Sequence, residues 1–127
     1  MKKVYLVLFV AVLLVACQAK ASFKTISVED FSELVKEDGV VILDVRSLDE
    51  YTESHITDAT FLDVTDSLFN EKALGQFNKN QKIAVYCRTG KRSKTASSKL
   101  LELGFKEIYD LDGGITEWKE AGYSVVE

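Results

Sequence analysis

The stretch Ile83-Ala84-Val85-Tyr86-Cys87-Arg88-Thr89-Gly90-Lys91-Arg92-Ser93 places a cysteine directly after a short apolar run and before a helical pattern. The apolar run is typical of a buried strand, and residues 93–103 carry apolar side chains at helical spacing. These patterns predict a strand over 82–86, a loop that begins with Cys87, and a helix that starts at Ser93. Cys87 is therefore expected at the carboxyl end of a strand, where open α/β sheets place their ligands.

The loop that begins with Cys87 is rich in positive charge. Backbone N–H groups at the start of a helix have no partner within that helix, so they stabilise an anion placed there. Arg88, Lys91 and Arg92 add three cationic side chains. Together these groups predict a lowered pKa for Cys87 and a nucleophilic thiolate, in a cradle that also attracts an anionic substrate. The alternatives are an inert cysteine at a strand end and a solvated basic face.

Residues 1–16 have the features of a secretory signal peptide. Two lysines precede an apolar run that is too short for a comfortable membrane span of about 20 residues. The run closes with Leu14-Val15-Ala16-Cys17, which resembles the bacterial lipobox. This resemblance implies cleavage before Cys17 and attachment of lipid to its sulfur. The alternatives are an ordinary signal peptide cut a few residues later and an uncleaved anchor.

Cleavage at this point would leave a short tether over 17–24 and one domain over 25–127. The domain is expected outside the cytoplasm, in the periplasm or cell envelope, and anchored to the membrane by the lipid. A chain of this length holds a single core, and we expect a monomer. With 16 basic and 20 acidic residues the chain carries a formal charge of −4, which argues against nucleic-acid binding.

Cysteine and histidine usage limits the chemistry further. The chain has two cysteines and one histidine. If Cys17 is lipidated, Cys87 has no cysteine partner and cannot form an internal disulfide. A structural zinc site needs four ligands, and Cys87 and His55 are the only strong soft-ligand candidates that remain. We therefore expect neither a metal nor an organic cofactor.

Elsewhere short apolar runs alternate with helical patterns. Strands are expected over 25–27, 40–43, 60–62 and 108–111, and helices over 27–37, 47–53, 71–77 and 115–121. This alternation predicts an α/β fold in which helices flank a mostly parallel sheet.

Four blocks of the sequence together resemble the rhodanese family of single-domain sulfurtransferases. The blocks are 43–46, 50–59, 85–93 and 111–122. The resemblance covers nearly all of residues 25–127 and implies a three-layer sandwich around a mostly parallel five-stranded sheet. The second block departs from the family pattern, because Ser54 and Asp58 stand where members often have glycine and the chain has no proline. These departures leave the path of that loop open.

The resemblance implies a thiosulfate sulfurtransferase in which Cys87 is the nucleophile. Cys87 would accept a sulfane sulfur from thiosulfate or a similar anionic donor, become a persulfide, and pass the sulfur to a thiophilic acceptor such as cyanide or a thiol. Amides of the loop would cradle the persulfide, and its cations would neutralise the donor and the departing sulfite. The substrate-binding residues expected on this basis are Arg88, Thr89, Gly90, Lys91, Arg92 and Ser93.

Three other residues are expected to support the site without reacting. Asp44 and Arg46 follow a buried strand and are expected to tie its end to neighbouring loops. His55 is a candidate general base by residue type, but the resemblance implies a structural role for it.

Three other functions fit part of the pattern. A phosphatase or arsenate reductase needs Cys, five residues and then Arg, but Ser93 stands at that position and Arg92 comes one residue early. A non-catalytic rhodanese module that binds a partner would have the same fold, although such modules commonly lose the cysteine or the loop charges. A persulfide carrier fed by a protein donor shares every site residue with the thiosulfate enzyme, so the sequence does not separate these two.

Overall fold

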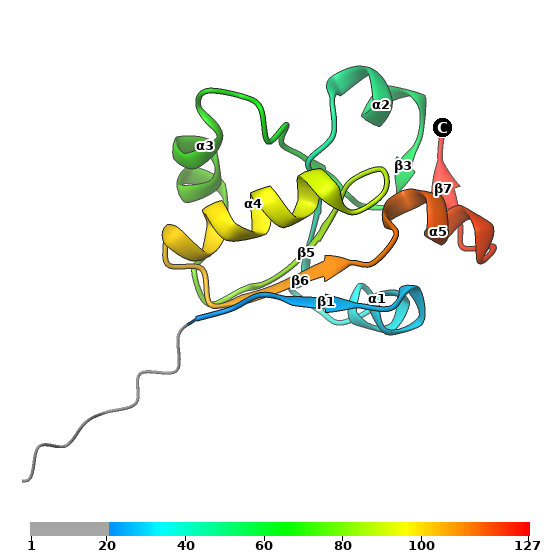
Figure 1. The fold of residues 1–127 in the computed structure, drawn as a ribbon, viewed down its shortest axis with the longest axis horizontal. Coiled ribbons are helices and arrows are strands. Elements are labelled where there is room, and N and C mark those ends of the chain that lie inside the picture. The colour runs from blue at the N-terminus through cyan, green and yellow to red at the C-terminus, as the bar shows by residue number, and fades with distance from the viewer. Residues whose placement is uncertain (1–20) are drawn as a thin grey trace, which may run out of the picture.

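A parallel sheet of five strands, in the order β1-β6-β5-β2-β4, forms the centre of the molecule (Figure 1). The computed structural model describes residues 21–127, so the expected signal peptide and Cys17 lie outside the described residues. All four neighbouring pairs run parallel, which confirms the predicted sheet. The strands are β1 (Lys24–Ile26), β2 (Val41–Asp44), β4 (Thr60–Phe61), β5 (Lys82–Tyr86) and β6 (Glu107–Leu111).

Helices cover both faces of this sheet and complete the expected three-layer sandwich. α3 and α4 pack on one face, and α1 and α5 pack on the other (Figure 1). A shorter helix, α2, follows β2. The helices are α1 (Val28–Leu34), α2 (Leu48–Glu53), α3 (Phe69–Gln76), α4 (Lys91–Glu102) and α5 (Gly114–Glu120).

The side chains of β5 alternate between two apolar cores. Ile83 and Val85 belong to the core under α3 and α4, whereas Ala84 and Tyr86 belong to the core under α1 and α5. This alternation follows from the period of two residues in a strand. Because both faces are covered, β5 is apolar along most of its length, as expected for a strand at the centre of a parallel sheet.

Two helices begin at side-chain caps that the sequence predicts. The Ser27 hydroxyl accepts a hydrogen bond from the Asp30 backbone N–H at the start of α1. Ser47 and Glu50 form a reciprocal capping box at the start of α2. These caps satisfy N–H groups that the first helical turn leaves without partners.

The structure differs from the predictions where no periodic pattern exists. β3 (His55–Ile56) pairs with β7 (Val125–Val126) in a second, antiparallel sheet, and strands of two residues are too short to show alternation. α3 begins at Phe69, two residues earlier than expected, because its N-cap Leu68 makes no side-chain cap bond that would mark the start. α4 also begins two residues early, at Lys91.

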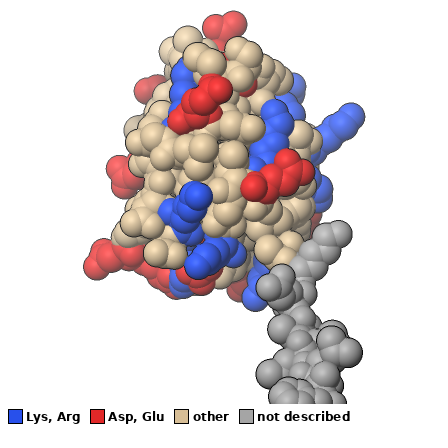
Figure 2. All heavy atoms as spheres, turned by 90° about the vertical axis from the view of Figure 1, so that its left-hand side faces the viewer, with Lys and Arg blue, Asp and Glu red and all other residues tan. Residues whose placement is uncertain are grey.

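Charges of both signs are interspersed on the face that Figure 2 shows, and neither sign forms a continuous patch on that face of the described residues. Within residues 21–127 no helix is both long enough and apolar enough to cross a membrane.

Candidate active site

Cys87 lies in the turn between β5 and α4, and its side chain is almost fully buried. Gly90 is the N-cap of α4 and adopts a positive φ of 107°, a conformation that costs glycine little. This conformation directs the Gly90 N–H to the sulfur of Cys87 at 3.1 Å. The Ser93 hydroxyl, in the first turn of α4 and fully buried, lies 3.4 Å from the same sulfur, within hydrogen-bond distance of it.

The pKa of Cys87 lies below its ordinary value. Burial is the largest single influence and opposes ionisation, but hydrogen bonds to the thiolate outweigh it. These bonds come from the Ser93 hydroxyl and from the backbone N–H groups of Ser93, Gly90 and Thr89. The direction agrees with the expectation from the sequence, and the backbone N–H groups named there are among its causes. The largest of the influences that lower this pKa are hydrogen-bond donors of the loop and of the first turn of α4, and the cationic side chains are not among them.

The start of α5 holds the carbonyl groups of the loop away from the sulfur. The Ile115 N–H donates to the Cys87 carbonyl at 2.9 Å, and Thr116 donates to the Arg88 carbonyl from its N–H at 3.2 Å and from its hydroxyl at 3.0 Å. Since these carbonyls have partners in α5, the N–H groups of the loop are left to face Cys87. Gly114 makes the contact possible because it has no side chain at the closest approach.

Replacement of Gly114 by alanine is expected to push the loop away from α5. A Cβ atom at this position would overlap the Arg88 carbonyl oxygen, and the residue has a φ of +61°. We expect Gly114→Ala to lower the free energy of unfolding by about 2–3 kcal/mol, as measured by urea denaturation. The matched control is Gly75→Ala in α3, where a new Cβ meets no atom within 4 Å and a gain of about 0.5–1 kcal/mol is expected. Equal stability of Gly114→Ala and the wild type would contradict this account of the loop.

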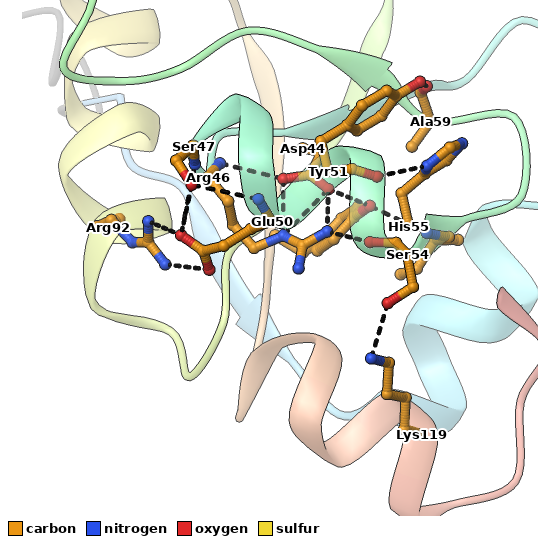
Figure 3. Close-up of polar contacts among 12 residues, drawn as sticks. Asp44, Arg46, Ser47, Glu50, Tyr51, Ser54, His55, Ala59, Arg92 and Lys119 are labelled. Carbon is orange, nitrogen blue, oxygen red and sulfur yellow. Dashed lines mark hydrogen bonds and ion pairs between the residues drawn. The ribbon is translucent and has the colours of Figure 1, made fainter. Parts of the chain in front are cut away.

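Arg92 forms a bidentate ion pair with Glu50, which ties the first turn of α4 to α2 (Figure 3). The two N–O distances are 2.7 and 2.8 Å. The hydrogen bond from Arg92 is the largest of the influences that lower the pKa of Glu50 to about 2. Arg92 is one of the expected substrate-binding cations, and in this structure its guanidinium lies on the Glu50 carboxylate.

Glu50 is expected to stabilise the fold in a pH-dependent way. Its pKa falls from an ordinary 4.5 to about 2 in the folded chain, so its contribution is complete above pH 4.5 and is lost as the pH falls towards 2. We expect Glu50→Gln to lower the free energy of unfolding at pH 7 by about 1 kcal/mol, since the pair is partly exposed to solvent.

Urea denaturation at pH 7, 4 and 2.5 measures this contribution. The difference between Glu50→Gln and the wild type should shrink over these three values. Glu53→Gln, on the same helix, serves as the control and should stay within about 0.5 kcal/mol of the wild type. A difference that is constant from pH 7 to 2.5 would show that the ion pair is not its source.

Asp44 and Arg46 form a buried ion pair at the carboxyl end of β2, as expected for residues that support the loops (Figure 3). Arg46 donates to both carboxylate oxygens of Asp44 and, at 2.6 Å, to the Ser54 carbonyl. The Tyr86 hydroxyl donates to Asp44 at 2.6 Å and accepts the Ile56 N–H. Burial is the main cause of a raised pKa for Tyr86, and the negative charge of Asp44 adds to it. This network fixes the segment after β2 to the end of β5.

His55 lies against Tyr51, and its contacts fit the structural role that was expected. The two rings are stacked with centroids 3.9 Å apart, and the Nδ1 atom of His55 is 2.9 Å from the Tyr51 carbonyl oxygen. The Tyr51 hydroxyl in turn donates to the Ala59 carbonyl. These contacts set the path of the loop that the sequence left open.

A cleft of about 430 Å³ lies beside the loop, between the α2 region and α5. Arg88 reaches it from the loop and is exposed, as is Lys91. Lys119 of α5 also lines the cleft and donates to the Ser54 hydroxyl at 2.8 Å (Figure 3). An anion in this cleft would therefore meet the cationic side chains of Arg88 and Lys119. The described part of the chain holds no cluster of three or more His, Cys, Asp or Glu side chains that is suited to a metal ion.

Sequence reasoning missed the partners that come from distant segments. Glu50 forms a capping box with Ser47, which is a local contact, yet it also binds Arg92 of α4, which no local pattern indicates. The contacts of Thr116 and Lys119 were not predicted, because no local pattern marks a helix whose N-terminus meets a loop 28 residues earlier. A signal was present in the pair Gly113-Gly114, since adjacent glycines indicate close backbone approach.

Fold and site together define an α/β protein with a buried cysteine whose sulfur has hydrogen-bond partners in the loop between β5 and α4 and in the first turn of α4. The family described as the Rhodanese-like domain matches residues 27–121. A thiosulfate sulfurtransferase (GlpE) from Coxiella burnetii is 41% identical over 98 residues, which cover 76% of this chain and 88% of that protein. The chain therefore belongs to the rhodanese-like domain family.

Solved structures agree with this assignment. The crystal structure of a rhodanese-related protein from Thermoplasma volcanium is 32% identical, with a TM-score of 0.70, and the match covers 81% of this chain and 97% of that one. The rhodanese-like domain of an Anabaena protein, solved by NMR, has a TM-score of 0.73 at 27% identity, with 80% and 77% of the two chains covered.

Proposed function

We propose that this protein is a sulfurtransferase that carries sulfur as a persulfide on Cys87. The observation that carries the proposal is the set of donors around the sulfur, since the Gly90 N–H and the Ser93 hydroxyl both lie within hydrogen-bond distance of it. Such donors stabilise a thiolate before reaction and a persulfide anion after it. Relatives at 34–41% identity are named thiosulfate sulfurtransferases, which supports thiosulfate as the donor.

The proposed reaction has two steps. The Cys87 thiolate attacks the outer sulfur of thiosulfate, an S–S bond forms to Cys87, and sulfite leaves with the electron pair of the broken bond. Cyanide or a thiolate then attacks the outer sulfur of the persulfide, and the Cys87 thiolate is released with the electron pair. Arg88 and Lys91 are exposed cations of the loop, and in this proposal they attract the divalent donor and the departing sulfite.

The spacing of the loop argues against phosphoryl transfer as an alternative. The residue six positions after Cys87 is Ser93, whose hydroxyl faces the sulfur. The nearest arginine, Arg92, is held by Glu50. No arginine therefore stands at the position, six residues after the cysteine, that a phosphate-binding loop needs for the equatorial oxygens of a phosphate.

Steady-state kinetics test the proposal. The full-length chain is incubated with thiosulfate and cyanide, and thiocyanate is measured while both substrates are varied. Two successive half-reactions predict ping-pong behaviour, with parallel lines in double-reciprocal plots. Intersecting lines would contradict a covalent intermediate, and absence of turnover with several acceptors would exclude thiosulfate as the donor.

A persulfide carrier fed by a protein donor is the second candidate. It is favoured by one relative, a putative sulfur carrier protein (YrkF) from Bacillus subtilis, which is 31% identical over 99 residues, 77% of this chain and 52% of that protein. A carrier should react slowly with thiosulfate but rapidly with a persulfide on another protein. Comparison of the two loading rates at equal donor concentration separates the candidates.

We also propose that the mature protein is anchored by lipid outside the cytoplasm. The lipobox-like segment that ends at Cys17 supports this location. Metabolic labelling of the expressed chain with a radioactive fatty acid is the direct test. Label in the wild type and none in Cys17→Ser would support lipidation, whereas label in neither would contradict it.

A further inference from the structure

A lysine of α4 connects the cysteine loop to a buried carboxylate at the end of β6. The ammonium of Lys94 donates to the Gly90 carbonyl at 3.2 Å and to the Asp110 carboxylate at 3.0 Å. Asp110 is fully buried, and the same carboxylate oxygen accepts the Thr25 hydroxyl of β1 at 2.9 Å. Three elements of the fold, α4, β6 and β1, thus meet at one charged contact behind Gly90.

The ion pair of Lys94 and Asp110 is an unfavourable arrangement if its only role is to stabilise the fold. The second carboxylate oxygen of Asp110 is buried and has no hydrogen-bond partner within the described part of the chain. The Lys94 side chain is half-exposed, so solvent weakens the attraction between its ammonium and the buried Asp110 carboxylate. A buried carboxylate with one cation and a free oxygen is less favourable than an apolar pair of similar volume. Its position next to the cysteine loop points to a role in the site.

The role follows from the freedom of Gly90. A glycine with positive φ is permissive, and without restraint it can turn its N–H away from the sulfur. The Lys94 ammonium lies 3.5 Å from the point where a Cβ of Gly90 would be, so it packs directly against this residue. The Lys94 ammonium therefore restrains Gly90 through its carbonyl group. In the conformation held in this way, the Gly90 N–H lies 3.1 Å from the Cys87 sulfur.

We propose that Lys94 and Asp110 are positioning residues, which hold Gly90 so that its N–H points at the sulfur of Cys87. This inference rests on the proposed function, because it assigns these two residues to the same reaction. Asp110 orients the lysine, the lysine orients Gly90, and Gly90 supports the negative charge on sulfur. Neither Lys94 nor Asp110 touches the reacting atoms.

The test uses the rate at which Cys87 is alkylated by iodoacetamide between pH 5 and 9. Full-length chains carry Cys17→Ser so that Cys87 is the only thiol. Lys94→Met removes the restraint on Gly90 but leaves the buried charge of Asp110 without its cation. The double variant Lys94→Met, Asp110→Asn removes both, so its stability in urea should approach that of the wild type. Lys99→Met is the matched control, since Lys99 lies on α4 and contacts the Val64 carbonyl instead of the loop.

We expect the double variant to be alkylated about tenfold more slowly at pH 6, with its pH profile moved to higher pH. Lys94→Arg and Lys99→Met should keep the profile of the wild type. A double variant with the wild-type profile would overturn the inference and leave only a structural role. Alkylation needs no sulfur donor, so a moved profile in a chain that does not use thiosulfate would uphold the inference while the proposed function fails.

Discussion

Cys87→Ser should abolish sulfur transfer and leave the fold intact. Serine has nearly the same shape, and its hydroxyl can still bond to the Gly90 N–H and to Ser93, the two partners of the cysteine sulfur. A hydroxyl is a poor nucleophile here because it does not ionise near neutral pH, and it cannot form a persulfide. We expect a loss of roughly 10⁴-fold or more in thiocyanate formation, the scale seen when a covalent nucleophile is removed.

The same substitution at the other cysteine is the matched control. Cys17→Ser should retain the rate of the wild type, since the proposed reaction does not involve Cys17. Circular dichroism and urea denaturation should show that Cys87→Ser stays folded. Thiocyanate formation by a folded Cys87→Ser variant at more than a few per cent of the wild-type rate would contradict the persulfide mechanism.

Arg46→Met should be among the most destabilising single substitutions in the chain. Methionine fills a similar volume, but Asp44 keeps a charge that is fully buried and loses its cation. Removal of one partner of a buried pair costs about 3–5 kcal/mol, a large part of the 5–15 kcal/mol typical of a folded domain. Urea denaturation at pH 7 measures this loss.

Two further variants show where the loss arises. The double variant Asp44→Asn, Arg46→Met removes the unpaired charge and should recover part of the stability. Lys36→Met breaks an ion pair on the surface, in which the Lys36 side chain is 68% exposed and the Glu33 side chain is 75% exposed. It should change the free energy of unfolding by less than about 1 kcal/mol. A cost of Arg46→Met as small as that of Lys36→Met would contradict the structural role of the buried pair.

Most of the fold could be predicted from the sequence because its signals are local. The apolar run of β5 and the caps Ser27 and Ser47 lie within the segments that they define. The antiparallel pair of β3 and β7 could not be predicted, since its strands are far apart in the chain and only two residues long. Its formation depends on tertiary packing and not on a local pattern.

The site divides in the same way. Cys87 and the loop after it could be identified from their order in the chain, whereas the groups that orient them could not. Asp110 reads as an ordinary residue at a strand end, and only the fold shows that it is buried against Lys94. The sequence around Glu50 likewise indicates only a helix cap, and its ion pair with Arg92 becomes evident only from the fold, which brings α2 next to α4.

The most direct test of the central proposal is the intact mass of the protein after reaction with thiosulfate. The Cys17→Ser chain is reduced, incubated with thiosulfate and measured beside a chain that also carries Cys87→Ser. We predict a gain of one sulfur atom in the first chain alone, and loss of that atom after addition of cyanide. No gain of sulfur, from a thiol that still reacts with iodoacetamide, would contradict direct transfer from thiosulfate to Cys87.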